Sequence, residues 1–129
     1  MIKCTLLVAS QWAILDKFTN LLSLYNILEA FTVSKFPTNL SEITAMSFIE
    51  RNTQDPEEIE IVAKVCIWEQ VIQEQQVKVN FNGKLKHKRL YKIAGIKLEE
   101  WSEELSISIY HKNEEINRYK IDIIHKPKK

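Results

Sequence analysis

The stretch "EIEIVAKVCIW", residues 58–68, alternates apolar and polar side chains with a period of two over most of its length. Successive side chains of a β-strand point to opposite faces, so this pattern predicts a strand with one face in a hydrophobic core. Two glutamates at its start and Trp68 at its end indicate that the second face runs from water to a covered region. The predicted core-facing residues are Ile59, Ile61, Ala63, Val65 and Ile67.

Other stretches alternate in the same way and predict further strands. Residues 77–81 are followed directly by Asn82-Gly83, the strongest short signal for a β-hairpin, because both central residues of a type I′ turn have positive φ. Residues 105–110 and 119–123 flank the polar turn "KNEE" and predict a second hairpin. At the N-terminus, one apolar face is expected to contain Ile2, Cys4, Leu6 and Val8.

These strands predict an all-β domain spanning residues 1–129, an antiparallel sandwich of about seven to eight strands with an immunoglobulin-like architecture. A composition of 45% hydrophobic and 27% charged residues is typical of a globular chain. The chain has only two glycines, so asparagines must occupy some positions with positive φ. The candidates are Asn20, Asn26, Asn39, Asn52 and Asn113.

The segment "AILDKFTNLLSLYNILEAF", residues 13–31, allows two interpretations. Its apolar residues recur at steps of four and three, which favours a short amphipathic helix within residues 12–30. Alternatively, Asn20 and Asn26 punctuate short strands over residues 20–34. The helix remains the alternative to the strands.

The order of these features resembles a family of small bacterial and phage β-sandwich domains of unknown function. The residues that carry the resemblance are "CTLLVAS" (4–10), the acidic Asp16, "NLLSLYNILEAFTVSKFP" (20–37) with its Phe36-Pro37, and the closing segment 91–124. Asn20 and Asn26 stand where that family usually has glycine, and "EEWSEEL" replaces a further glycine. The resemblance implies an all-β sandwich with strands over residues 20–34, and it implies no activity and no site residues.

The two cysteines, Cys4 and Cys66, are expected to be buried free thiols in a cytoplasmic protein. An immunoglobulin-like pin of Cys4, Trp12 and Cys66 is conceivable, but Trp12 follows the first cysteine too soon. No apolar run approaches the roughly 18 residues of a spanning helix, so no membrane contact is expected.

Enzymatic and metal chemistry lack a sequence signature. The candidate ligands His87, His111, His125, Cys4 and Cys66 show no metal-binding spacing, and neighbouring glutamates on a strand point to opposite faces. There is no nucleophile elbow, phosphate loop or dinucleotide fingerprint. We therefore expect no enzyme, no cofactor and no metal.

The run "KLKHKRLYK", residues 84–92, is the main candidate binding feature. Its Lys84, Lys86 and Lys88 share one strand parity, and Arg89 has the other. Lysines along a strand also protect a sheet edge from pairing with other chains, which is the favoured interpretation. Trp101, in the acidic loop "EEWSEEL", either plugs the end of the sandwich or is an exposed interface residue.

The favoured function is a non-enzymatic protein-interaction or structural module that binds a protein partner or itself through a sheet face or edge. The alternative is a contact with nucleic acid or an acidic partner through residues 84–92. A net charge of +1 gives no global attraction to nucleic acid, which makes it the less favoured partner.

Overall fold

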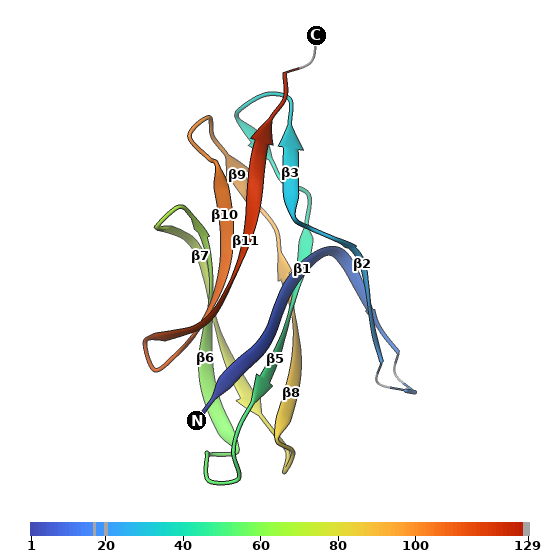
Figure 1. Ribbon diagram of the computed structural model, residues 1–129, viewed down its shortest axis with the longest axis vertical. Coiled ribbons are helices and arrows are strands. Elements are labelled where there is room, and N and C mark those ends of the chain that lie inside the picture. Colours follow the sequence, from blue (N-terminus) through green and yellow to red (C-terminus); the bar gives the residue numbers. More distant parts are fainter. Residues whose placement is uncertain (17, 20, 128–129) are drawn as a thin grey trace.

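The computed structural model describes residues 1–16, 18, 19 and 21–127 (Figure 1). All regular secondary structure in these residues consists of β-strands, which confirms the predicted all-β class. The alternative of a short helix within residues 12–30 is wrong, since none of its described residues is helical. In the part of the chain that the structure describes, no helix is long and apolar enough to cross a membrane.

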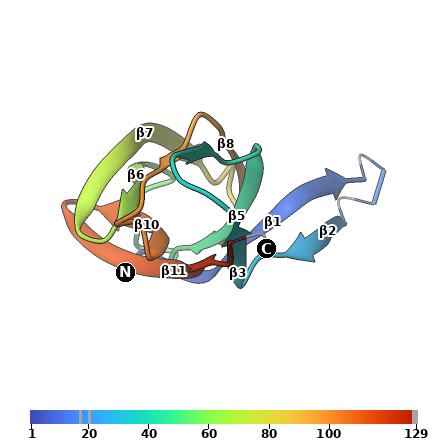
Figure 2. The same cartoon turned by 90° about the horizontal axis from the view of Figure 1, so that it is seen from above.

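The strands form two larger sheets and one small one (Figures 1 and 2). The four-stranded sheet has the order β2 (Leu22–Ile27), β1 (Lys3–Leu15), β5 (Ile43–Glu50), β8 (Lys86–Ile93). The five-stranded sheet has the order β3 (Ala30–Val33), β11 (Glu114–His125), β10 (Glu104–His111), β6 (Glu58–Ile67), β7 (Gln70–Asn80). The small sheet pairs β4 (Thr38–Asn39) with β9 (Lys97–Leu98).

The arrangement differs from the prediction in two respects. The described residues form eleven strands rather than seven or eight, and two of these have only two residues. The pairing is antiparallel except between β3 and β11, which are parallel. The parallel pair arises because the chain leaves β2, crosses to the other sheet at Leu28 and Glu29, and there runs alongside the last strand.

One hydrophobic core includes side chains from both larger sheets. The five residues predicted from residues 58–68 are all buried, as expected from their alternation. Leu105, Ile107 and Ile109 of β10 and Ile121 of β11 extend the same core and are at most 1% exposed. From the four-stranded sheet, Ala45 and Ile49 of β5 join them.

The alternation of buried and exposed side chains in the N-terminal strand shifts by one residue part of the way along it. Its pairing with β5 shifts register between Cys4 and Leu6, where a β-bulge inserts one extra residue. Ile2 and Cys4 are buried before the bulge, whereas Leu7 and Ala9 are buried after it. The prediction that Leu6 and Val8 share the core face is therefore wrong, because the bulge turns them to the opposite side.

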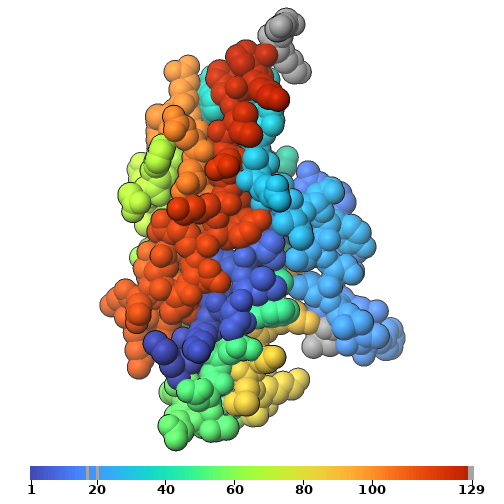
Figure 3. All heavy atoms as spheres, in the orientation of Figure 1, coloured from blue at the N-terminus to red at the C-terminus, as the bar shows by residue number. Residues whose placement is uncertain are grey.

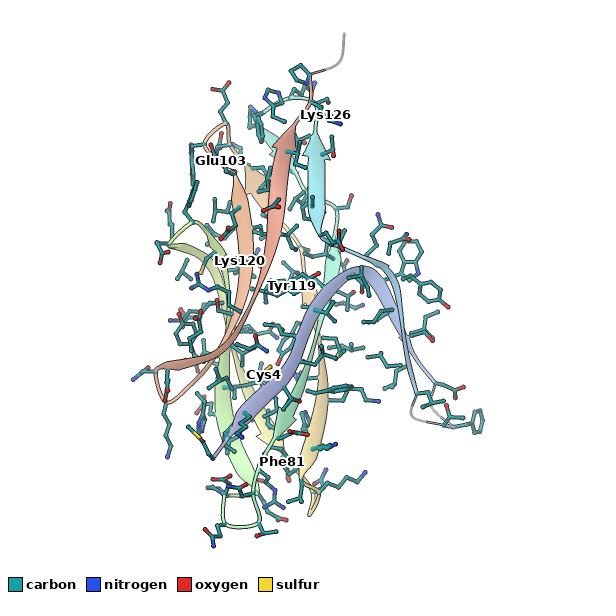
Figure 4. The ribbon with its side chains drawn as sticks, viewed as in Figure 1. Cys4, Phe81, Glu103, Tyr119, Lys120 and Lys126 are labelled. Carbon is teal, nitrogen blue, oxygen red and sulfur yellow. The ribbon has the colours of Figure 1, made fainter. Side chains whose placement is uncertain are left out.

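Asn82 and Gly83 have the predicted positive φ values of 50° and 77°. They do not close a hairpin, however, because β7 and β8 belong to different sheets. Phe81, which is 2% exposed, anchors this turn in the core, and its amide donates to the Glu57 carbonyl at 2.9 Å (Figure 4). Burial of Phe81 takes the chain across the core instead of back along the same sheet.

The second predicted hairpin is confirmed, since β10 and β11 are antiparallel neighbours joined at Lys112-Asn113, both with positive φ. Asn26 and Asn113 have positive φ as expected, Asn39 and Asn52 do not, and Asn20 lies outside the described residues. Trp68 has a φ of 56° in the tight turn between β6 and β7, a position that the sequence pattern had assigned to the strand.

Cys4 and Cys66 are buried free thiols, as predicted, and no immunoglobulin-like pin forms. Burial raises the pKa of both thiols. Trp12, the third member of the conceivable pin, is 52% exposed.

Shortening a core side chain tests the packing between the sheets. We expect Ile107→Ala to lower the free energy of unfolding by about 2–5 kcal/mol, because buried contacts are lost and a cavity remains. The matched control Val71→Ala, on the exposed edge strand β7, should change it by no more than about 0.5 kcal/mol. Urea unfolding measures both values, and equal losses would contradict this core.

His87 gives the fold a pH dependence. Its ring lies edge-on to Phe81, with centroids 6.2 Å apart, and its buried Nε2 has no hydrogen-bond partner among the described residues. Burial, followed by the nearby charge of Arg89, lowers the pKa of His87. The unfolded chain then takes up the proton at a higher pH than the folded chain, so stability is lost as the pH falls below about 6.5.

We therefore expect His87→Phe to lose less stability than the wild type between about pH 7 and about pH 5. Urea unfolding at each pH measures the loss. A smaller dependence should remain in the variant, because the pKa of His111 is also lowered, chiefly by burial. Identical losses in the two proteins would contradict the role of His87.

Candidate functional site

A two-stranded arm projects from the body of the molecule (Figures 1 and 2). The arm consists of residues 11–27, of which the structure describes all but 17 and 20. It forms because the last pair between β1 and β5 joins Ser10 to Thr44, and β1 continues past this point with only β2 as a neighbour. Each of the two strands of the arm therefore has the other as its only neighbour.

The arm exposes seven large apolar side chains, half of the fourteen exposed large apolar side chains among the described residues. Phe18 at its tip is 101% exposed and Leu21 is 69% exposed. An isolated two-stranded hairpin is only marginally stable in water, and monomeric proteins rarely expose apolar patches larger than a few hundred Å². The seven are Trp12, Ile14, Leu15, Phe18, Leu21, Tyr25 and Ile27.

The strand register divides the arm into two faces. Trp12 pairs with Tyr25, and their rings lie 6.1 Å apart between centroids at an angle of 32°. Ile14 and Ile27 share this face by alternation, and we call these four residues the arm face. On the opposite face Leu15 pairs with Leu22, and the side-chain Nδ2 of Asn26 donates to Gln11 Oε1 at 2.7 Å.

The arm face continues onto the outer surface of the four-stranded sheet. Leu6 and Val8 have the parity of Trp12, and they pair with Phe48 and Met46 of β5. One strand further, Leu90 of β8 pairs with Met46. We call Leu6, Val8, Phe48 and Leu90 the outer apolar patch, all of which are partly or fully exposed. The outer apolar patch and the arm face lie on the same side of the four-stranded sheet, with the buried Ser10 between them on β1.

Side chains at the tip stabilise the turn between the two strands of the arm. Asp16 Oδ1 accepts hydrogen bonds from the amides of Phe18, at 2.8 Å, and Thr19, at 3.3 Å. Thr19 Oγ1 accepts from the Leu21 amide at 3.3 Å. These bonds to the backbone compete with a helix, which explains why the helical periodicity of this segment does not produce one. They also lower the pKa of Asp16, the Phe18 amide contributing most.

The root of the arm is fixed to the five-stranded sheet. The hydroxyl of Tyr119, on β11, donates to the Leu28 carbonyl at 2.6 Å (Figure 4). The Leu28 amide donates to the Ala9 carbonyl at 2.8 Å, and the side chain of Leu28 is buried. The arm therefore leaves the body from an ordered base, and Figure 3 shows its side chains standing clear of the body.

A groove opens beside this root. It has a volume of about 510 Å³ and lies between residues 11–12 and the chain from Phe31 to Ile43. Trp12 lines it, so the same indole contacts Tyr25 and borders the groove. The apolar surface therefore extends from the arm into a concave part of the molecule.

The predicted basic strand forms an edge of the four-stranded sheet, as edge protection requires. Its cations are divided between the two sides. Lys86 and Lys88 share the outer side with Phe48 and Leu90, and Lys86 pairs with Glu50 at 3.5 Å. Arg89 has the opposite parity and lies on the side of Tyr91 and the core.

Lys84 precedes the strand, and its carbonyl accepts from Arg51 Nε at 2.8 Å. The structure thus places Lys86 and Lys88 beside the outer apolar patch, and it brings neither Lys84 nor Arg89 to the same place. The five residues proposed from the sequence do not form one site.

Trp101 is 50% exposed, so the interpretation that it plugs the end of the sandwich is wrong. Its carbonyl accepts the indole N–H of Trp68 at 3.0 Å, which places two exposed tryptophans together. Both lie beside the five-stranded sheet, in the turn after β6 and in the loop before β10. Trp101 is therefore separate from the basic strand.

No group of three His, Cys, Asp or Glu side chains suited to a metal ion occurs within residues 1–16, 18, 19 and 21–127. The arm face and the outer apolar patch consist of apolar side chains, which can pack against a partner but carry no catalytic or metal-binding group. Sequence reasoning missed this surface, because "WAIL" and "LLSLYNI" have the composition of buried strands. The available signal was the absence of charge over residues 21–27.

A scan against models of protein families finds no match to this chain, and a search of curated proteins finds none either.

The hydrogen bonds of Asp16 can be tested by titration. We expect the amide chemical shift of Phe18 to change with pH at a midpoint below the usual value for aspartate, about 3.9, because the charged carboxylate is the better acceptor. The tip is then lost as the pH falls through this lowered pKa. Asp16→Ala should abolish the transition, and a midpoint at or above the usual value would contradict the arrangement.

Proposed function

We propose that this chain is a non-enzymatic protein-interaction module that binds a protein partner through the arm face and the outer apolar patch. The observation that carries the proposal is the exposure of seven large apolar side chains on one projecting hairpin. Aromatic residues are enriched at the centres of protein interfaces, and Trp12, Phe18 and Tyr25 supply them here.

The surroundings of the surface also support protein binding. Lys86, Lys88 and Lys92 share the outer side of β8, so charged groups border the outer apolar patch on that edge. An apolar centre with a polar rim is the usual anatomy of a protein interface. The alternative, nucleic acid or an acidic partner bound by residues 84–92, has weaker support, because Arg89 and the lysines lie on opposite sides of β8.

The proposal includes a finer description of the fold. We infer that residues 1–129 are one domain in which the two larger sheets pack as an immunoglobulin-like sandwich. The support is a single hydrophobic core with side chains from both sheets. This architecture agrees with the resemblance to small bacterial and phage sandwich domains. The two free thiols favour a cytoplasmic location.

Photo-crosslinking in the cells that make the protein tests the proposal. A photoreactive phenylalanine analogue replaces Phe18 or Tyr25 on the arm, and Val71 or Leu85 as matched exposed apolar controls. We expect protein adducts, with this chain or another, to be several-fold more abundant from the arm positions. Equal yields from the arm and control positions, or no adducts from the arm, would contradict the proposed function.

A further inference from the structure

The outer edge of β2 differs from the other long edges because it carries no charge. Its six residues, Leu22–Ile27, include no Asp, Glu, Lys or Arg. The edge strand β8 carries three lysines and an arginine, and the edge strand β7 carries Glu74 and Lys78. The remaining edge strand, β3, is uncharged but only four residues long. Charges and short length both oppose pairing with other chains, so β2 is the least protected edge of the larger sheets.

A second copy of this chain can pair with this edge, as its charge and its symmetry allow. Residues 11–27 include one Asp and one Lys, so two arms approach each other without net repulsion. Strand β2 pairs antiparallel with β1, and an antiparallel pair with a second β2 has two-fold symmetry. Such a contact closes on itself and adds no further copies.

The apolar area of the arm is of the size that a stable dimer buries. A fully covered aromatic side chain contributes about 200 Å², and aliphatic side chains contribute less. Applied to the exposed fractions of all seven apolar side chains, on both faces and at the tip of the arm, this value gives an upper limit of roughly 800 Å² per copy. A protein interface of standard size buries about 800 Å² per partner.

We propose that two copies of this chain form a symmetric dimer in which their β2 strands pair antiparallel and the two arms become one four-stranded ribbon. The proposal rests on the proposed function and names the partner as a second copy. Antiparallel pairing sets the tip of each arm beside the root of the other. Phe18 and Leu21 of one copy thereby approach Ile27 and the outer apolar patch of the second copy.

The test uses a charge on the paired edge. Ser23 is an exposed residue of β2, so Ser23→Lys removes no core contact, but in the dimer it places one cation from each copy on two adjacent strands. The matched control is Gln75→Lys, an exposed position on the edge strand β7. Sedimentation equilibrium over a concentration series measures the dimer dissociation constant of each purified protein, and circular dichroism confirms that each is folded.

We expect the wild type and Gln75→Lys to reach twice the 15.2 kDa mass of the chain. Ser23→Lys should weaken the dimer by roughly tenfold or more, because it places like charges on two adjacent uncharged strands. Mixing Ser23→Lys with Ser23→Glu should restore association as a heterodimer. This rescue distinguishes self-pairing of β2 from a general loss of stability.

Three results would overturn the dimer. These are a wild-type monomer at every concentration, a dimer that Ser23→Lys leaves intact, and a mixture of the Lys and Glu variants that stays monomeric. A monomer whose arm crosslinks to a different protein in cells would overturn the dimer and leave the proposed function standing. An arm that crosslinks to nothing would overturn both.

Discussion

The length of β1 relative to β5 is the constraint on which the rest of this structure depends. Both strands pair from Lys3 with Glu50 to Ser10 with Thr44, and there β5 ends its contact with β1. Strand β1 continues to Leu15, five residues and about 17 Å further at the rise of a β-strand. Beyond Ser10 it has β2 as its only neighbour, so the arm cannot enter the body of the molecule, and its apolar side chains remain in water.

The β-bulge near Thr5 decides which side chains of this long strand face outward. Without the extra residue, Leu6 and Val8 would continue the buried parity of Ile2 and Cys4. With it, they lie on the same side as Trp12 and beside Phe48. The bulge therefore leaves Ile2 and Cys4 in the core, and it turns Leu6 and Val8 to the side of the sheet on which the arm face lies.

The distribution of charge over the sheet edges separates the two functions considered. Strand β8 carries cations along a sheet edge, where they oppose strand addition by other chains. Strand β2 lacks this protection and presents leucines, a tyrosine and an isoleucine. The two edges belong to the same sheet, at opposite ends of the order β2-β1-β5-β8. Strand addition by another chain is therefore least opposed at β2, and the charges of β8 oppose it at the other edge of the sheet.

The sequence by itself determined the elements whose pattern is local. Alternation located β6 and its five core residues, and the polar turn "KNEE" between two alternating stretches located the β10–β11 hairpin. The tertiary structure alone decided the rest, because it depends on distant partners. Asn82-Gly83 turns as its residues require, yet the buried Phe81 sends the chain to the other sheet. Residues 11–27 have the composition of buried strands, and they form an exposed arm because β5 begins only at Ile43 and gives β1 no partner beyond Ser10.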